Sequence, residues 1–365
     1  MLALVPALCF LFAAESAAPP DIASILKQAA KAQAAGHTGE AARLYTQGVE
    51  AHPRWAEGWW SLAALLFDQQ RFPEAETALQ RFVGLVPNPW TAYALLGLCE
   101  YETRDYGAAE KHLAEWAAKK PPTSKELMAD AFFHWALLLT RDRRFEPALV
   151  LLKSQARLGN RGPAMVEAMG LASLRIASVP EEYPPAEREP VWMAGRAKLE
   201  TAFRQFDEAA ANAKLLLLHY GAHPNVHYFI GLVLLEVQDN AGAAKEFERE
   251  LEISPRHVPA MLQLALYDAE GGEAEKGLPL ARRAVQLAPN DFTAHAGLGK
   301  VLLAAGRAND SIQELEIARR LAPDNPFVHW TLSQAYAAAG RHDDAARERA
   351  AFAKLSPRTA DREAR

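Results

Sequence analysis

Apolar residues recur at spacings of three and four along most of the chain, which is the period of one face of an α-helix. Runs of about 13 residues with this period come in pairs, and each pair is followed by a short connection with a proline. The prolines fall in two series with a spacing of 34 residues, Pro53, Pro87 and Pro121, and then Pro255, Pro289, Pro323 and Pro357. This pattern predicts a chain of helix pairs.

A common register becomes visible when each 34-residue unit is placed with its proline at the thirty-second place. The units then start at Ile22, Ala56, Trp90, Pro224, Val258, Phe292 and Pro326. The eighth and twentieth places hold only Ala, Gly or Ser, which allows two helices to cross closely. The fifteenth place is often Gly, as at Gly36 and Gly306, which suits a helix end with positive φ. One pair cannot bury its own apolar face, so neighbouring pairs must stack.

These small, aliphatic and proline positions resemble the tetratricopeptide repeat family over nearly the whole chain after the N-terminal segment. The resemblance implies an all-α fold, a right-handed superhelical solenoid of antiparallel helix pairs with eight or nine repeats. We expect the repeats over residues 19–177 and 191–357, followed by a polar tail over 358–365.

The middle of the chain, residues 122–223, keeps the helical period but loses the register. Between two helical stretches, residues 178–190 read SVPEEYPPAEREP, with four prolines and four glutamates in place of a helix. We expect a loop there. It is either a hinge between two halves or a surface insertion, and composition favours a solvated insertion.

The first residues contain an apolar run from Leu2 to Ala14, followed by small residues and two prolines. This resembles a secretory signal over residues 1–18 and predicts an exported protein, periplasmic or secreted. No Lys or Arg precedes the run, which leaves a short N-terminal helix as the alternative. The run is too short to span a bilayer, so no integral membrane segment is expected in the mature chain. Of the two cysteines, only Cys99 would remain after cleavage.

Composition and motifs exclude several classes of function. A net charge of −5 without a basic cluster argues against nucleic-acid binding. The sequence contains no Gly-rich phosphate loop, no paired-cysteine metal motif and no nucleophile elbow. We therefore expect no enzyme, no catalytic residue and no cofactor.

Histidines are the remaining candidates for metal binding. His219, His223 and His227 lie four residues apart, but Gly221 and Pro224 interrupt the helix between them, so a shared face is not expected.

Histidine also recurs at the fourth place of three units, as His227, His295 and His329. These residues are one or two repeats apart, too far to share an ion. We interpret them as half-buried packing residues.

The family resemblance implies that the first helix of each pair lines a concave groove through its second, fifth, ninth, twelfth and thirteenth places. The expected groove residues are aromatic or acidic: Trp60, Phe67, Asp68, Tyr101, Glu102, Phe133, Tyr228, Glu236, Glu270, Phe327 and Trp330. Such a surface suits an apolar or mildly basic peptide. Alternatively, several of these residues serve ordinary packing between helices. A clamp for a terminal carboxylate is not expected, because only Asn225 and Lys300 lie at groove places and they are two repeats apart.

The sequence thus predicts an exported, non-enzymatic scaffold that binds a protein or peptide partner in its groove, in the assembly of an envelope or extracellular complex. The alternatives are a non-catalytic solenoid subunit of an envelope enzyme complex and a metal-binding protein.

Overall fold

The computed structural model of the chain describes residues 20–356. Nineteen α-helices and one short 3₁₀ turn make up its regular structure, and no strand occurs among these residues. The all-α fold of helix pairs is therefore confirmed. The expected signal segment, Cys9 and the tail over 358–365 lie outside the described residues.

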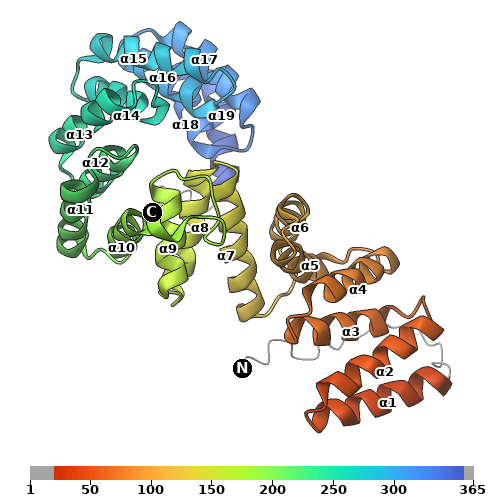
Figure 1. Ribbon diagram of the computed structural model, residues 1–365. Coiled ribbons are helices and arrows are strands. Elements are labelled where there is room, and N and C mark those ends of the chain that lie inside the picture. Colours follow the sequence, from red (N-terminus) through yellow and green to blue (C-terminus); the bar gives the residue numbers. More distant parts are fainter. Residues whose placement is uncertain (1–19, 357–365) are drawn as a thin grey trace. The chain divides into compact units, whose positions relative to one another are not determined.

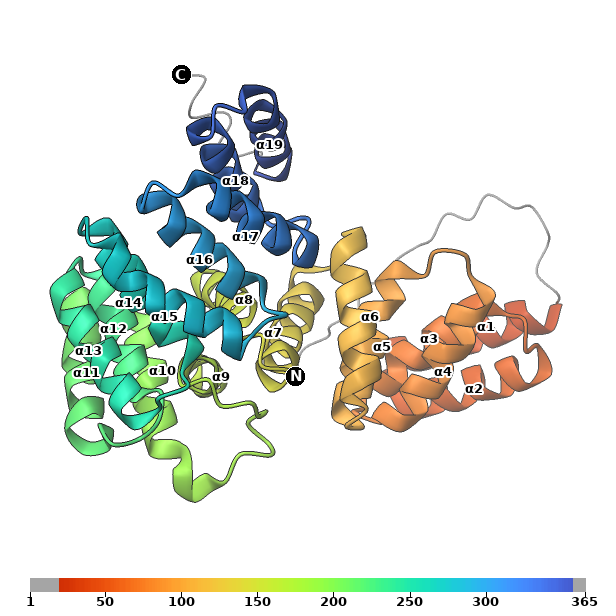
Figure 2. The ribbon, with the colours of Figure 1, turned by 90° about the horizontal axis from the view of Figure 1, so that it is seen from above.

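The chain divides into two compact units between Gly195 and Arg196. The helices up to this boundary, which lies within α10, are α1 (Pro20–Ala34), α2 (Thr38–Ala51), α3 (Ala56–Asp68), α4 (Phe72–Leu85), α5 (Trp90–Glu102), α6 (Tyr106–Lys119), α7 (Lys125–Arg141), α8 (Phe145–Arg157), α9 (Pro163–Ser173) and α10 (Arg188–Ala202). Figures 1 and 2 show the first four helices lying side by side as two antiparallel pairs.

The second unit continues the alternation of first and second helices. Its helices are α11 (Phe206–Tyr220), α12 (Val226–Glu236), α13 (Asn240–Ile253), α14 (Val258–Glu270), α15 (Ala274–Leu287), α16 (Phe292–Ala304), α17 (Ala308–Leu321), α18 (Pro326–Ala338) and α19 (His342–Leu355). Within the described residues, eight pairs of consecutive helices pack against each other, α1–α2, α3–α4, α5–α6 and α7–α8 in the first unit and α12–α13, α14–α15, α16–α17 and α18–α19 in the second. Eight or nine repeats were expected.

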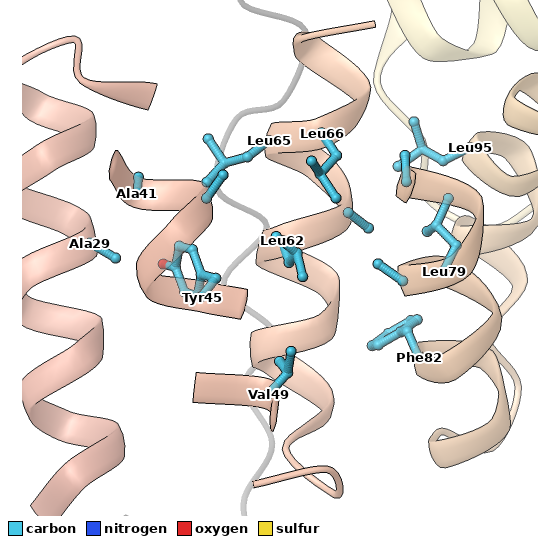
Figure 3. Close-up of a cluster of buried hydrophobic side chains, with 14 of the residues drawn as sticks. Ala29, Ala41, Tyr45, Val49, Leu62, Leu65, Leu66, Leu79, Phe82 and Leu95 are labelled. Carbon is cyan, nitrogen blue, oxygen red and sulfur yellow. The ribbon is translucent and has the colours of Figure 1, made fainter. Parts of the chain in front are cut away.

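The small places of the register lie where helices cross. All fourteen are buried, and Ala29, Ala63, Ala75 and Ala109 are 0% exposed. A Cβ atom added to Gly97 would lie 2.6 Å from the Leu113 side chain, so a larger residue on α5 would collide with α6. Figure 3 shows how large apolar side chains of the first five helices, including Tyr45, fill the space around such contacts.

The fifteenth place always adopts a left-handed backbone, including in units without glycine. Gln70, Arg104 and Gln238 have φ of 58°, 67° and 66° there, like Gly36 at 76°. In each case the next amide reaches back five residues, as Asp105 N–H does to the Glu100 carbonyl at 2.8 Å, which closes the first helix.

The same closure follows α9, where Arg175 has φ 55° and the Ile176 amide donates to the Leu171 carbonyl. The helix α9 thus ends as a first helix does, but residues 174–187 replace its second helix. The 3₁₀ turn Pro185–Glu187 lies within this segment, and the last three residues of the expected loop, from Arg188 to Pro190, form the first turn of α10.

Two glycines allow α9 and α10 to touch through their backbones. A Cβ atom on Gly170 would lie 1.9 Å from the Val191 carbonyl oxygen, and one on Gly195 would lie 1.8 Å from the Val166 carbonyl oxygen. Both distances are shorter than the 2.6 Å found at Gly97 between the paired helices α5 and α6.

Candidate functional site

The expected groove residues of α3 are partly occupied by packing. The Trp60 ring lies 5.2 Å from Phe82 of α4, and the Phe67 ring lies 5.7 Å from Phe72, in both cases measured between ring centroids. Both Trp60 and Phe67 are half-buried, and Asp68 is exposed at the end of the helix. The α3 surface therefore offers the outer parts of two aromatic rings beside one carboxylate.

The side chain of Tyr101 on α5 is buried by its neighbours. Its side chain is 4% exposed, and its hydroxyl donates to the Glu181 carboxylate at 2.9 Å. Its ring lies 4.7 Å from His134 of α7 and 5.4 Å from Tyr106. Glu102, the next residue, is exposed. Burial, and then the Glu181 charge, raises the pKa of Tyr101, so the phenol stays a neutral donor.

The α7 side of this cluster adds a cation and more aromatic surface. Arg141 stacks on Tyr106, 4.6 Å from the ring centroid, and its Nε lies 3.5 Å from a Glu182 carboxylate oxygen. Phe133 is half-buried, and its ring lies 5.5 Å from His134 in an edge-to-face arrangement. Tyr101 of α5 and Arg141 of α7 thus meet two carboxylates, Glu181 and Glu182, from residues 178–190.

In the second unit, the expected residues differ in exposure. Tyr228 is 5% exposed and packs against Phe247 at 5.8 Å, whereas Phe327 is 47% exposed at the start of α18. Trp330 is half-buried, with its ring 5.3 Å from Phe352. Of these aromatic side chains, Phe327 offers the most surface to a partner.

The two carboxylates of this unit that were expected in the groove, Glu236 and Glu270, are paired with lysines of neighbouring first helices. Lys198 Nζ lies 2.7 Å from Glu236, and Lys300 Nζ lies 2.8 Å from Glu270. The sequence predicted these acids at groove places but not their pairing, because the pairing depends on the separation of stacked helices. Such pairs weaken the attraction of the surface for a basic peptide.

The ninth and twelfth places of this unit also hold half-buried leucines that sequence reasoning did not single out. They belong to α12, α14 and α16 and are Leu232, Leu235, Leu266 and Leu303. They could have been found by comparing these two places across successive repeats. Together with Phe327 and Trp330 they make the first helices of this unit partly apolar.

The histidines take structural positions. His227 Nδ1 lies 2.6 Å from Glu246, and His223 is exposed. Asn225 bonds to His257 at 2.9 Å. No group of three or more potential ligands that could hold a metal ion occurs in the part of the chain that the structure describes. None of the described helices combines the length and apolar character that a bilayer crossing requires.

Comparison with known proteins identifies the repeat. The family model described as "Tetratricopeptide repeat" matches residues 26–88, 65–123, 195–258, 262–326 and 297–357. These segments cover well over half of the chain.

Among curated proteins, the protein CTR9 homolog of Arabidopsis thaliana is 30% identical over 89 residues, which is 24% of this chain and 8% of that protein. The match therefore spans only a small part of that relative.

Similar solved structures include a MamA RS-1 ArsTM double mutant, 20% identical with a TM-score of 0.40, where the match covers 46% of this chain and 94% of that chain. Another is MamA 41-end from Desulfovibrio magneticus RS-1, 21% identical with a TM-score of 0.39, covering 45% of this chain and 96% of that chain.

Proposed function

Because the chain belongs to the tetratricopeptide repeat family, we propose that it is a non-enzymatic scaffold whose first helices bind a protein or peptide partner. Repeats of this kind present extended surfaces built from the same places of successive units. The partner lies along the first helices, where the second, fifth, ninth, twelfth and thirteenth places repeat.

The observation that carries this proposal is the partly apolar surface on the first helices of the second unit. Phe327 is 47% exposed, and the leucines of α12, α14 and α16 keep part of their side chains accessible. A few anchor residues, often aromatic, supply most of the binding energy in protein interfaces, and the surrounding contacts exclude water. Because Glu236 and Glu270 are paired with lysines, an apolar segment suits this surface better than a basic one.

We propose a non-enzymatic role because the sequence contains no Gly-rich phosphate loop, no nucleophile elbow and no paired-cysteine metal motif. Many ionisable side chains of the described residues also serve contacts between helices, as Glu246 does with His227.

We place the scaffold outside the cytoplasm, in the assembly of an envelope or extracellular complex, because of the apolar run from Leu2 to Ala14 and the small residues after it. N-terminal sequencing of the protein from its native host tests this part. We expect a mature chain that begins near Ala17, and an intact Met1 in a cytoplasmic fraction would refute export.

Affinity capture from the native host, with bound proteins identified by mass spectrometry, tests the binding surface. The Phe327→Ala variant should lose a captured partner, because removal of an interface anchor costs about 2 kcal/mol, roughly thirtyfold in affinity. The matched control is Leu321→Ala, which removes a 41% exposed apolar side chain from the second helix α17. Equal loss in both variants, or retention in both, would reject the first-helix surface of this unit.

A further inference from the structure

Residues 178–187 are held against the first helices of the first unit. The sequence alone favoured a solvated connector here. Instead, Val179 is 0% exposed and Tyr183 is 8% exposed, so the segment has two apolar anchors four residues apart. The amides of Glu182 and Tyr183 both donate to the Val179 carbonyl, which folds the segment into a tight turn between these anchors.

Arg188 fixes the turn from its C-terminal side. Its Nη2 donates to the carbonyl oxygens of Pro180, at 2.7 Å, and Tyr183, at 3.2 Å. Its Nε lies 3.1 Å from the carboxylate of Glu167, which is 6% exposed on α9. A guanidinium with several oxygen partners is strongly oriented. The conformation of the segment is therefore defined by side chains outside the surface it covers.

The two carboxylates at the tip of this turn face that surface. Glu181 accepts the hydrogen bond of Tyr101, and Glu182 lies beside Arg141. Both glutamates are exposed, so these contacts lie at the edge of the segment where another chain could replace them. We call the surface formed by Tyr101, Tyr106 and Arg141 the tyrosine–arginine surface.

Comparison among repeats shows what the segment changes. Tyr101 occupies the twelfth place of its unit, where Phe67, Leu235 and Leu303 are half-buried in other units. Tyr101 is 4% exposed, and its hydroxyl is bonded to the segment. A place that is half-buried in other repeats is thus buried here, where the Tyr101 ring packs against His134 and Tyr106 and its hydroxyl is bonded to the segment.

We propose that the tyrosine–arginine surface is a receptor for a short acidic peptide with two adjacent carboxylates, and that residues 178–187 occupy it as a tethered competitor. This deepens the proposed function and rests on it. A donor phenol and a guanidinium select carboxylates. A tethered segment competes at an effective concentration of about millimolar, so a partner must bind tightly to displace it.

The experiment measures binding of a fluorescent peptide with the sequence of residues 177–187 to the full-length chain. The wild type should bind it weakly because the tethered copy competes. The double variant Glu181→Ala, Glu182→Ala should bind it at least about tenfold more tightly, since hydrogen bonds to charged groups typically contribute this much. The control variant Glu187→Ala removes an exposed carboxylate of the same segment and should leave peptide affinity unchanged.

Two further variants place the binding. In the released double variant, adding either Tyr101→Phe or Arg141→Gln should reduce peptide affinity about tenfold. Arg141 is 39% exposed, so its replacement provides a test that does not depend on the packing around Tyr101. A peptide with both glutamates changed to glutamine should bind about tenfold more weakly than the acidic peptide.

The proposal is overturned if wild type and released variant bind the peptide equally, if binding survives both Tyr101→Phe and Arg141→Gln, or if the glutamine peptide binds as well as the acidic one. Its failure is separable from failure of the proposed function. If Phe327→Ala loses its captured partner but the peptide binds to neither the wild type nor the released variant, only the tethered competitor is rejected.

Discussion

The ring of His329 joins the carboxylate of Glu348 to the connection that precedes its own repeat. Nδ1 of His329 lies 2.5 Å from Glu348 Oε2, and Nε2 lies 2.7 Å from the carbonyl oxygen of Pro323. His295 makes the same two contacts with Glu314 and Pro289. A polar ring at the fourth place thus ties together a first helix, its second helix and the preceding turn.

This relationship makes His329 a stability determinant. His329→Phe keeps a ring of similar size but removes both hydrogen bonds and leaves polar atoms without partners. We expect the free energy of unfolding to fall by about 1–3 kcal/mol. Urea denaturation followed by circular dichroism measures it. The control His342→Phe changes an exposed histidine on α19 and should shift stability by no more than about 0.5 kcal/mol.

The backbone contact between α9 and α10 leads to a second prediction. Gly170→Ala places a Cβ atom 1.9 Å from the Val191 carbonyl oxygen, so one helix must move and the protein should lose at least about 1–3 kcal/mol. Gly84→Ala on α4 meets nothing within 4 Å and should stabilise by about 0.5–1 kcal/mol. Melting temperatures of the two variants should move in opposite directions, and a shared direction would contradict the close crossing.

Glu250 supplies a third prediction because it is 0% exposed and accepts hydrogen bonds from the backbone amides of Asn225 and Tyr228. It therefore caps the start of α12 from the neighbouring helix. Glu250→Ala should cost about 1–3 kcal/mol and increase amide hydrogen exchange in the first turn of α12. Glu248→Ala, at an exposed place of the same helix, should change neither quantity appreciably.

The thiol of Cys99 should be inert in the folded protein. Burial, and then the carboxylates of Glu76, Glu100 and Glu102, raises its pKa to about 12. Because the thiolate is the reactive form, only about one thiol in ten thousand is ionised at pH 8. Iodoacetamide labelling, followed by mass spectrometry of the peptide containing Cys99, should be far slower in buffer than in denaturant. Comparable rates would show that α5 opens readily.

Much of the fold follows from the sequence because a helix pair is a local structure. The fixed period of Pro53, Pro87 and Pro121 sets the length of each unit, and the small residues of the eighth and twentieth places fix which faces meet. Each of these signals lies within a single repeat, and each concerns sterics or backbone conformation. The positive φ at Gly36 follows in the same way.

Other features depend on residues that are far apart in the chain and needed the tertiary structure. Glu181 reaches Tyr101 across 80 positions, and Lys300 reaches Glu270 across 30. Side chains at such distances in the sequence pair only after the helices have stacked, and no local period encodes their partners. The sequence therefore determined the length of the repeat and the positions of each first helix that are expected to face a partner. Tertiary packing decided which of those side chains are exposed and which carboxylates are paired with lysines. It also decided that Tyr101 is buried and bonded to Glu181.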